Sequence, residues 1–161
     1  MQNQSVLEAV RRSVLLLKAL VAFLALPGLV AFVTPLWLMS PGDAARFNLA
    51  GIVLVVTGTV LLLWCVHSFY AAGRGTLAPW SPPKSLVMTG LYKLSRNPMY
   101  VAVSLILWGW AIGFHSVPHA MYAIVVMAVF FLRVRFGEEP ALERQFGDEW
   151  RRYKLRVRRW L

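Results

Sequence analysis

The sequence predicts an all-α fold: an integral-membrane bundle of about four transmembrane helices with an amphipathic helical tail on the cytosolic side. Hydrophobic residues make up 58% of the 161 residues and charged residues only 15%, with a mean hydropathy of +0.59. That composition excludes an ordinary soluble enzyme. Four nearly charge-free stretches also approach the roughly 20 residues that a helix needs to cross about 30 Å of hydrocarbon. We interpret residues 1–161 as a single membrane domain.

The four expected spans cover about residues 14–39, 47–71, 99–116 and 117–134. The first contains Pro27 and Pro35, so we expect it to bend. Its apolar run is about twice as long as that of a signal peptide, which favours a retained helix. The second is the cleanest spanning helix. The last two form one apolar block broken by a polar, proline-containing turn over residues 115–119, which predicts a helical hairpin.

The basic residues orient this bundle. The chain carries 17 Lys and Arg against 7 Asp and Glu, a net charge of +10. Four basic residues lie in the loop 72–98 and nine more from Arg133 onward, whereas the connections on the opposite side contain only Arg46. Short loops rich in Lys and Arg stay cytoplasmic, so both termini and the loop 72–98 are predicted there. The membrane orientation thus accounts for the excess of positive charge, and no nucleic-acid partner is expected. The expected partners are membrane lipids.

The tail over residues 138–161 has an amphipathic helical pattern. Its apolar residues recur at intervals of three or four, on one helical face; they are Leu142, Phe146, Trp150, Tyr153 and Val157. Gly147 followed by Asp148 is typical of a helix stop and a new N-cap, so one helix and two short helices both fit. In either case we expect the tail on the membrane surface, with its basic face near anionic headgroups.

Two segments carry candidate chemistry. Arg96 and Pro98 stand where the loop re-enters the bilayer; an arginine there is costly without a partner, and a proline in a first helical turn leaves N–H groups that can face an anion. Glu138 and Glu139 follow the last span, either as a salt-bridged helix start or as ligands for polar groups of a small molecule. The single cysteine forms no internal disulfide, and no Cys/His cluster has zinc spacing, so no metal site is expected.

These segments belong to an ordered pattern over residues 84–161, half of the chain. Its motifs are Lys84-Ser85-Leu86-Val87-Met88-Thr89-Gly90-Leu91-Tyr92-x3-Arg96-Asn97-Pro98-Met99-Tyr100, an apolar hairpin, and Glu138-Glu139-Pro140-x-Leu142-x3-Phe146-Gly147-x2-Trp150-x2-Tyr153-x3-Val157-x-Arg159-Trp160-Leu161. The pattern resembles the isoprenylcysteine carboxyl methyltransferase and phospholipid methyltransferase group of integral-membrane enzymes. Three departures are Asn97, where the family's Arg-His-Pro has histidine, Ala102, where the family has glycine, and Arg158, where the family has a proline after the valine.

The resemblance implies that S-adenosylmethionine binds at the cytosolic face, between the loop before the hairpin and the carboxylates after it. The positions that match the family's cofactor contacts, or lie beside them, are Ser85, Leu86, Val87, Tyr92, Arg96, Asn97, Pro98, Met99, Tyr100, Glu138 and Glu139. Arg133 or Arg135 would be the catalytic arginine that orients the polar end of the acceptor. The acceptor would be lipid-like or otherwise apolar and would enter sideways from the bilayer.

Two alternative functions remain open from the sequence. Some membrane sterol reductases carry a similar C-terminal arrangement and use NADPH in place of S-adenosylmethionine. A noncatalytic membrane lipid-binding protein could also keep this fold, and the departures at Asn97 and Ala102 are the feature relevant to it. The sequence leaves the acceptor, the methylated atom (O, S or N) and the oligomeric state open.

Overall fold

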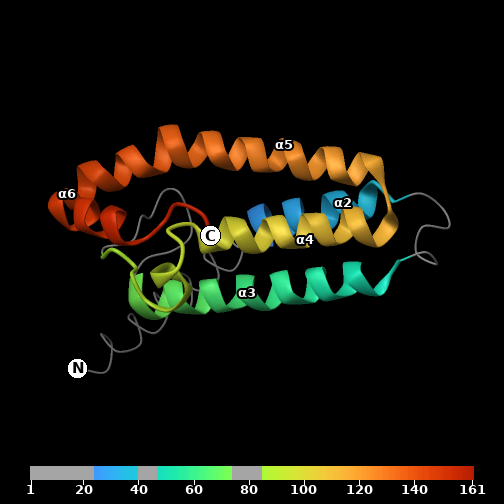
Figure 1. Cartoon of the computed structure of the whole chain (residues 1–161), viewed down its shortest axis with the longest axis horizontal. Coiled ribbons are helices and arrows are strands. Elements are labelled where there is room, and N and C mark those ends of the chain that lie inside the picture. Colours follow the sequence, from blue (N-terminus) through green and yellow to red (C-terminus); the bar gives the residue numbers. More distant parts are fainter. Residues whose placement is uncertain (1–23, 40–46, 74–84) are drawn as a thin grey trace, which may run out of the picture.

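The computed structural model describes residues 24–39, 47–73 and 85–161 of the chain. Within these residues the structure is helical, and the predicted all-α bundle is confirmed (Figure 1). In chain order the elements are η1 (Leu24–Val33), α2 (Thr34–Trp37), α3 (Leu49–Gly73), η3 (Gly90–Lys93), α4 (Pro98–Phe114), α5 (Val117–Arg133), η4 (Val134–Glu138) and α6 (Glu139–Arg156). Residues 14–23 of the first expected span, the connection with Arg46, and residues 74–84 of the predicted cofactor loop lie outside the described residues.

Helices α3, α4 and α5 run along the long axis of the molecule, and α3 and α4 form the most extensive helix pair (Figure 1). Glycine makes this approach possible. A Cβ added to Gly51 would lie 2.3 Å from the Cα of Gly113, and one added to Gly58 would lie 2.8 Å from the Ala102 carbonyl oxygen. Small residues that let two backbones come this close are typical of membrane helix pairs, where packing has to replace the hydrophobic effect.

The hairpin between α4 and α5 forms where the polar turn predicted it. His115 ends α4 in the left-handed conformation, with φ 51°, and Pro118 lies in the first turn of α5. The ring of His119 is buried; Nδ1 lies 2.7 Å from Ser116 Oγ and Nε2 lies 3.0 Å from the carbonyl oxygen of Pro35. His119 therefore joins the hairpin to α2.

The described part of the first expected span, for which a bend was predicted, is a π-helix followed by a short α-helix. Pro27 lies inside the π-helix η1, and Pro35 lies in the first turn of α2. Side chains from the hairpin bind carbonyl groups of this segment: Trp110 Nε1 donates to Ala31 O at 2.8 Å, and the Tyr122 hydroxyl donates to Val30 O at 3.1 Å. These bonds attach η1 to α4 and α5 and supply partners for its carbonyl groups, which have no water available in a bilayer.

Two helices in the described residues are long and apolar enough to cross a membrane. They are Leu49–Ser68 and the continuous helix that starts at Val117 and runs through α5 into α6. The segments Pro27–Trp37 and Pro98–Phe114 are apolar but shorter. The outward faces of α3 and α5 expose large aliphatic and aromatic side chains, which a soluble protein would bury. The expected spans at 47–71 and 117–134 thus meet the length criterion, and the expected span at 99–116 corresponds to the shorter α4.

The tail combines the two possibilities that the sequence left open. A single helical element, α6, runs from Glu139 to Arg156, but Gly147 within it has φ 49° and ψ −118°, so the chain turns sharply there. Glycine tolerates this left-handed conformation without the steric cost that a Cβ would add. The second half of α6 folds back toward η3 and buries Trp150 and Tyr153, two residues of the predicted apolar face (Figure 1).

Candidate functional site

The candidate site lies where α4 begins and α5 passes into α6, and its first part surrounds Glu138. Tyr100, in the first turn of α4, donates its hydroxyl proton to Glu138 Oε1, and Arg133 Nε donates to the same oxygen at 2.8 Å. The Tyr100 ring packs on Phe130 with ring centroids 4.5 Å apart. The Glu138 side chain is 35% exposed, and its other oxygen, Oε2, accepts no hydrogen bond from the residues that the structure describes. One carboxylate oxygen is therefore held in place, while the other is not used by the described part of the chain.

A π-helical turn sets the direction of these side chains. The five residues of η4 connect α5 to α6, and single π turns inside α-helices are frequent at functional sites. Val134 is completely buried, whereas Arg133 reaches Glu138 and Arg135 is exposed. Of the two arginines predicted as catalytic candidates, the structure brings Arg133 into contact with a predicted cofactor residue and does not bring Arg135 there.

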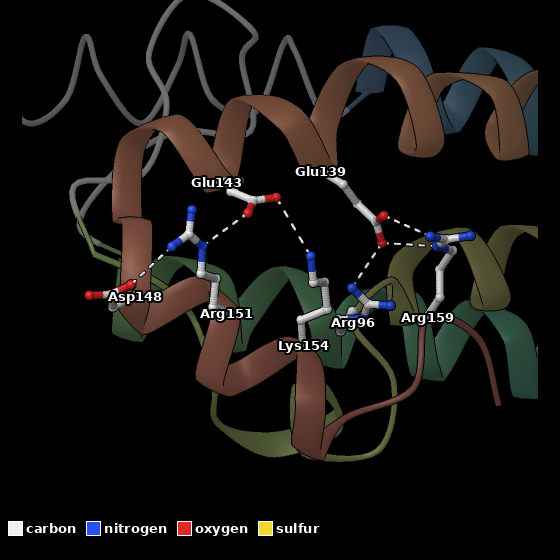
Figure 2. Close-up of polar contacts among 7 residues, drawn as sticks. All are labelled: Arg96, Glu139, Glu143, Asp148, Arg151, Lys154 and Arg159. Atoms are coloured by element: carbon white, nitrogen blue, oxygen red, sulfur yellow. Dashed lines mark hydrogen bonds and ion pairs between the residues drawn. The ribbon is translucent and has the colours of Figure 1, made fainter.

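The second part of the site surrounds Glu139, which is buried. Arg159 binds its carboxylate with two bonds, from Nε to Oε1 at 2.9 Å and from Nη2 to Oε2 at 2.8 Å, and Arg96 Nη1 lies 2.9 Å from Oε1 (Figure 2). A bidentate arginine pair of this kind is strong and fixes orientation. The hydrogen bonds to Glu139 raise the pKa of Arg159. Both oxygens of Glu139 are therefore occupied by the protein itself.

Arg96 is buried with unused hydrogen-bonding capacity. Its side chain is 8% exposed, and its guanidinium lies 5.5 Å from the centroid of the Trp150 ring. Burial lowers its pKa, an effect that the charge of Glu139 opposes, and the group remains a cation at neutral pH. Nη1 is close to Glu139 but is not aligned for a hydrogen bond; Nη1, Nε and Trp150 Nε1 have no acceptor within the described part of the chain. Three buried donors thus lie close together, and buried donors normally have a partner.

The end of the chain closes over this region as a short strap, residues Val157–Arg159. The Arg96 backbone N–H donates to Arg158 O at 2.9 Å, and the carbonyl oxygen of Arg159 accepts from Ser95 Oγ at 3.2 Å and from Asn97 Nδ2 at 3.1 Å. Asn97, the position at which the family pattern has histidine, therefore uses its side-chain amide to hold the strap. An amide in this role does not serve as a catalytic base.

The remaining predicted residues line the loop before α4. Tyr92 is buried, its backbone carbonyl accepts the Tyr153 hydroxyl at 2.6 Å, and burial raises the pKa of its own hydroxyl. Val87 is buried and Leu86 half-buried, whereas Ser85 is exposed. In α4, Pro98 is buried in the first turn and Met99 packs against the core. Five of the predicted residues thus form two clusters: a Glu138 cluster (Tyr100, Arg133, Glu138) and a Glu139 cluster in which Arg96 and Glu139 are joined by Arg159, a residue that was not predicted.

Sequence reasoning assigned no role to Arg159, Trp150 or Tyr153, which complete the Glu139 cluster and its surroundings. Trp150 and Tyr153 were predicted as part of an apolar face, and they stood with Arg159 in the family pattern without an assigned role. A signal for Arg159 existed in the composition, because two adjacent carboxylates beside a membrane need cations and the chain end is rich in arginine. The sequence did not indicate which of those arginines contacts Glu139, because that contact depends on where the strap packs.

Comparisons with known proteins add independent information on the same region. A family model described as phospholipid methyltransferase matches residues 47–149, which include the whole Glu138 cluster. The chain is 30% identical over 132 residues to methanethiol S-methyltransferase 1 of Bradyrhizobium diazoefficiens, covering 77% of this chain and 44% of that protein. It is 40% identical over 63 residues, 39% of this chain, to an uncharacterized protein of Haemophilus influenzae that is covered completely. No solved structure matches. The chain thus spans less than half the length of the Bradyrhizobium relative.

Proposed function

This chain belongs to the phospholipid methyltransferase family, and on that premise we propose that it is an integral-membrane methyltransferase that uses S-adenosylmethionine and methylates an apolar, membrane-soluble acceptor. The observation that carries the proposal is the state of Glu138. Its carboxylate is oriented by Tyr100 and Arg133, is partly open to solvent, and keeps one oxygen available. A carboxylate held in this way suits the ribose hydroxyls or the ammonium of the cofactor.

The donor set nearby fits the rest of such a ligand. S-adenosylmethionine supplies, when bound, an electrophilic methyl group on a sulfonium together with an amino-acid end of both charges. Glu138 would hold a hydroxyl or the ammonium, and Arg96, with buried donors that lack an acceptor, would face the carboxylate. The aromatic rings of Tyr92 and Tyr100 would shape the pocket for the cation. The protein's contribution to a one-step displacement is then alignment and exclusion of water.

The acceptor side of the proposal rests on the surroundings of the site. Helices α4 and α5, which carry Tyr100 and Arg133, belong to the apolar bundle, so a nucleophile dissolved in the bilayer would approach between hydrocarbon-facing side chains. The named relative is a methyltransferase for a small thiol, which makes small thiols and membrane lipids the two acceptor classes to test. Arg133 would orient the polar end of the acceptor, and exposed Arg135 is the second candidate for that role.

Ligand titration tests the cofactor. We expect purified protein in detergent to bind S-adenosylhomocysteine, and Glu138→Ala to weaken that binding at least tenfold, because a charge-assisted contact is worth about 1.5–3 kcal/mol. Glu143→Ala is the matched control, since Glu143 is a similarly exposed, arginine-paired carboxylate on α6 (38% against 35%). Binding of NADPH with no binding of S-adenosylhomocysteine would identify a reductase. Binding of neither would identify a noncatalytic membrane protein.

Transfer of labelled methyl to membrane lipid extracts and to small thiols then identifies the acceptor class. Labelling of a lipid would support an isoprenylcysteine-type or phospholipid-type acceptor, and labelling of a thiol would support a relationship in function to the Bradyrhizobium enzyme. Transfer to neither, under conditions where the cofactor analogue binds, would contradict an apolar acceptor.

The proposed topology places both termini and the loop 72–98 in the cytoplasm. In a Cys65→Ala background, cysteines at the exposed positions Met88 and Arg152 should be labelled from the cytoplasmic side, and a cysteine at exposed Val117 from the opposite side. Labelling of all three positions from one side would overturn the multi-pass arrangement.

A further inference from the structure

The cations on the second half of α6 divide into two groups with different surroundings. Arg151 and Lys154 are neutralised: Arg151 pairs with Glu143 at 3.1 Å and Asp148 at 3.3 Å, and Lys154 pairs with Glu143 at 3.5 Å (Figure 2). Arg152 and Arg156 lie four residues apart, on another face of the same helix. Both are exposed, and neither forms an ion pair with a residue that the structure describes.

Arg152 and Arg156 border a hollow between α6 and the segment around η3. The hollow has a volume of about 610 Å³ and is lined by Met88, Lys93, Glu149, Arg152, Tyr153, Arg156 and Val157. Three cations therefore face one carboxylate, Glu149. The Tyr153 hydroxyl is already bonded to Tyr92 O, so the tyrosine contributes mainly its ring to the lining. The lining thus combines apolar side chains with an excess of cations, which matches an amphiphile with a negative head.

The position of the hollow along the bundle is set by η3. A Cβ added to Gly90, the first residue of η3, would lie 3.0 Å from Ser68 Oγ and 3.6 Å from Trp64 Nε1 on α3. The segment Leu49–Ser68 has 20 residues, about 30 Å of helix, so Ser68 marks one edge of a hydrocarbon core. Trp64 is half exposed, as expected of an interfacial tryptophan. The hollow therefore opens at the depth of lipid headgroups.

Exposed leucines beside these cations strengthen the match to a membrane surface. Leu94 follows Lys93 and is 64% exposed, and Leu155 precedes Arg156 and is 86% exposed. Large aliphatic side chains that are open to solvent promote aggregation in water, but they are favourable at the boundary between headgroups and acyl chains. The cations beside them form no ion pair with the described residues. An acyl chain that leaves the hollow would meet them.

We propose that this hollow binds the phosphate-bearing headgroup of an anionic phospholipid, with Lys93, Arg152 and Arg156 around the phosphate. The site is distinct from the Glu138 and Glu139 clusters in the residues that form it, and it does not depend on the proposed methyl transfer. The hollow would bind one phospholipid specifically. This binding adds to the general attraction between the net charge of +10 and an anionic membrane surface.

The test is a lipid titration of the full chain in neutral detergent at low salt. Short-chain phosphatidylglycerol should raise the melting temperature in a saturable way, and phosphatidylcholine of the same acyl length should not. The double variant Arg152→Gln/Arg156→Gln should weaken phosphatidylglycerol binding about tenfold or more, since each cation near an anionic surface contributes appreciably. Arg151→Gln/Lys154→Gln is the matched control: it removes the same charge from the same half of α6 and should keep the affinity within about twofold.

Three outcomes would overturn the proposal. Equal losses in the two double variants would mean that net charge, and not the hollow, attracts the lipid. Equal binding of the two lipids would exclude headgroup charge as the cause. Binding of inorganic phosphate or glycerol 3-phosphate as tightly as the lipid would identify a site for a free phosphate compound. Failure of S-adenosylhomocysteine to bind would leave this measurement unaffected, so the two proposals are tested separately.

Discussion

Glu138 and Glu139 are neighbours in the chain, yet their carboxylates belong to regions of different construction. Glu139 is buried, both of its oxygens are bound by arginines, and one of those arginines comes from the last residues of the chain. Glu138 is partly exposed and uses only one oxygen toward the described residues. Glu139 thus holds the loop, α6 and the strap together, whereas Glu138 is the carboxylate to which we assign the ligand in the proposed function.

Removing the charge of Glu139 should give the largest effect on stability. Glu139→Gln leaves the buried Arg96 without its counter-charge, and breaking a buried pair from one side costs about 3–5 kcal/mol. We expect that decrease in the free energy of unfolding, measured by denaturant titration in mixed micelles. Glu143→Gln, which removes exposed pairs, should leave the free energy of unfolding nearly unchanged.

A double variant sharpens this prediction. In Arg96→Met/Glu139→Gln no unpaired buried charge remains, so the protein should recover a large part of the stability lost in Glu139→Gln alone. If Glu139→Gln unfolds no more easily than Glu143→Gln, or if the double variant is the less stable of the two, Glu139 does not have the structural role assigned here.

Arg159→Gln should have the next largest effect. It removes the bidentate bond to Glu139 but leaves Arg96 in place, and Arg159 is itself 25% exposed. A loss of about 1.5–3 kcal/mol is expected for hydrogen bonds to a charged partner. The matched control is Arg158→Gln, because Arg158 lies in the same strap with an exposed side chain and its contribution to docking is its backbone carbonyl. Similar losses in both variants would show that the strap is held by general charge and backbone contacts only.

Tyr100→Phe tests the other half of the comparison. It removes the hydroxyl donor to Glu138 and leaves Arg133 in place, so Glu138 stays near its position with less orientation. We expect S-adenosylhomocysteine binding to weaken about two- to tenfold, corresponding to about 0.5–1.5 kcal/mol for one hydrogen bond. Tyr122→Phe, which loses a bond to Val30 O at the other end of the bundle, should leave the affinity unchanged. An unchanged affinity in Tyr100→Phe would remove Tyr100 from the site.

Part of this arrangement could be predicted from the sequence, for physical reasons. Hydropathy and helix length located α3 and α5, because a bilayer imposes one length on every span. Pro27, Pro118 and Gly147 marked irregular points correctly, because their backbone limits are local. The contrast between Glu138 and Glu139 had no local signal. It depends on a strap almost twenty residues further along the chain that docks on Ser95–Asn97, and such a contact follows from tertiary packing alone.

The role of Asn97 shows the same limit. The family's Arg-His-Pro pattern has histidine where this chain has Asn97. From the sequence, this difference indicated that the chemistry of an imidazole is lost. The structure gives the side chain a different task, donation to the Arg159 carbonyl. The sequence thus shows that Asn97 departs from the family pattern, but the task of its side chain depends on the strap, which lies about sixty residues further along the chain.

We also expect a change in how stability depends on pH in the region around Glu139. Burial raises the pKa of Tyr153 from its ordinary value near 10 to about 12. Below about pH 10 the phenol is protonated in both the folded and the unfolded chain. Between about pH 10 and 12 the unfolded chain releases this proton and the folded protein keeps it, so stability falls as the pH rises. Phenylalanine has no proton to release, so Tyr153→Phe should lack this part of the decrease.

At neutral pH, Tyr153→Phe should be less stable by about 1 kcal/mol, because Tyr92 O loses its buried donor. The informative quantity is therefore the slope: the stability advantage of the unmodified protein over Tyr153→Phe should shrink between pH 9 and pH 12, while the titration of every other lysine and tyrosine cancels between the two proteins. Parallel unfolding curves across that range would mean that water reaches Tyr153. The strap and α6 would then not exclude water from the region around Glu139. The two clusters would therefore not differ in their access to solvent.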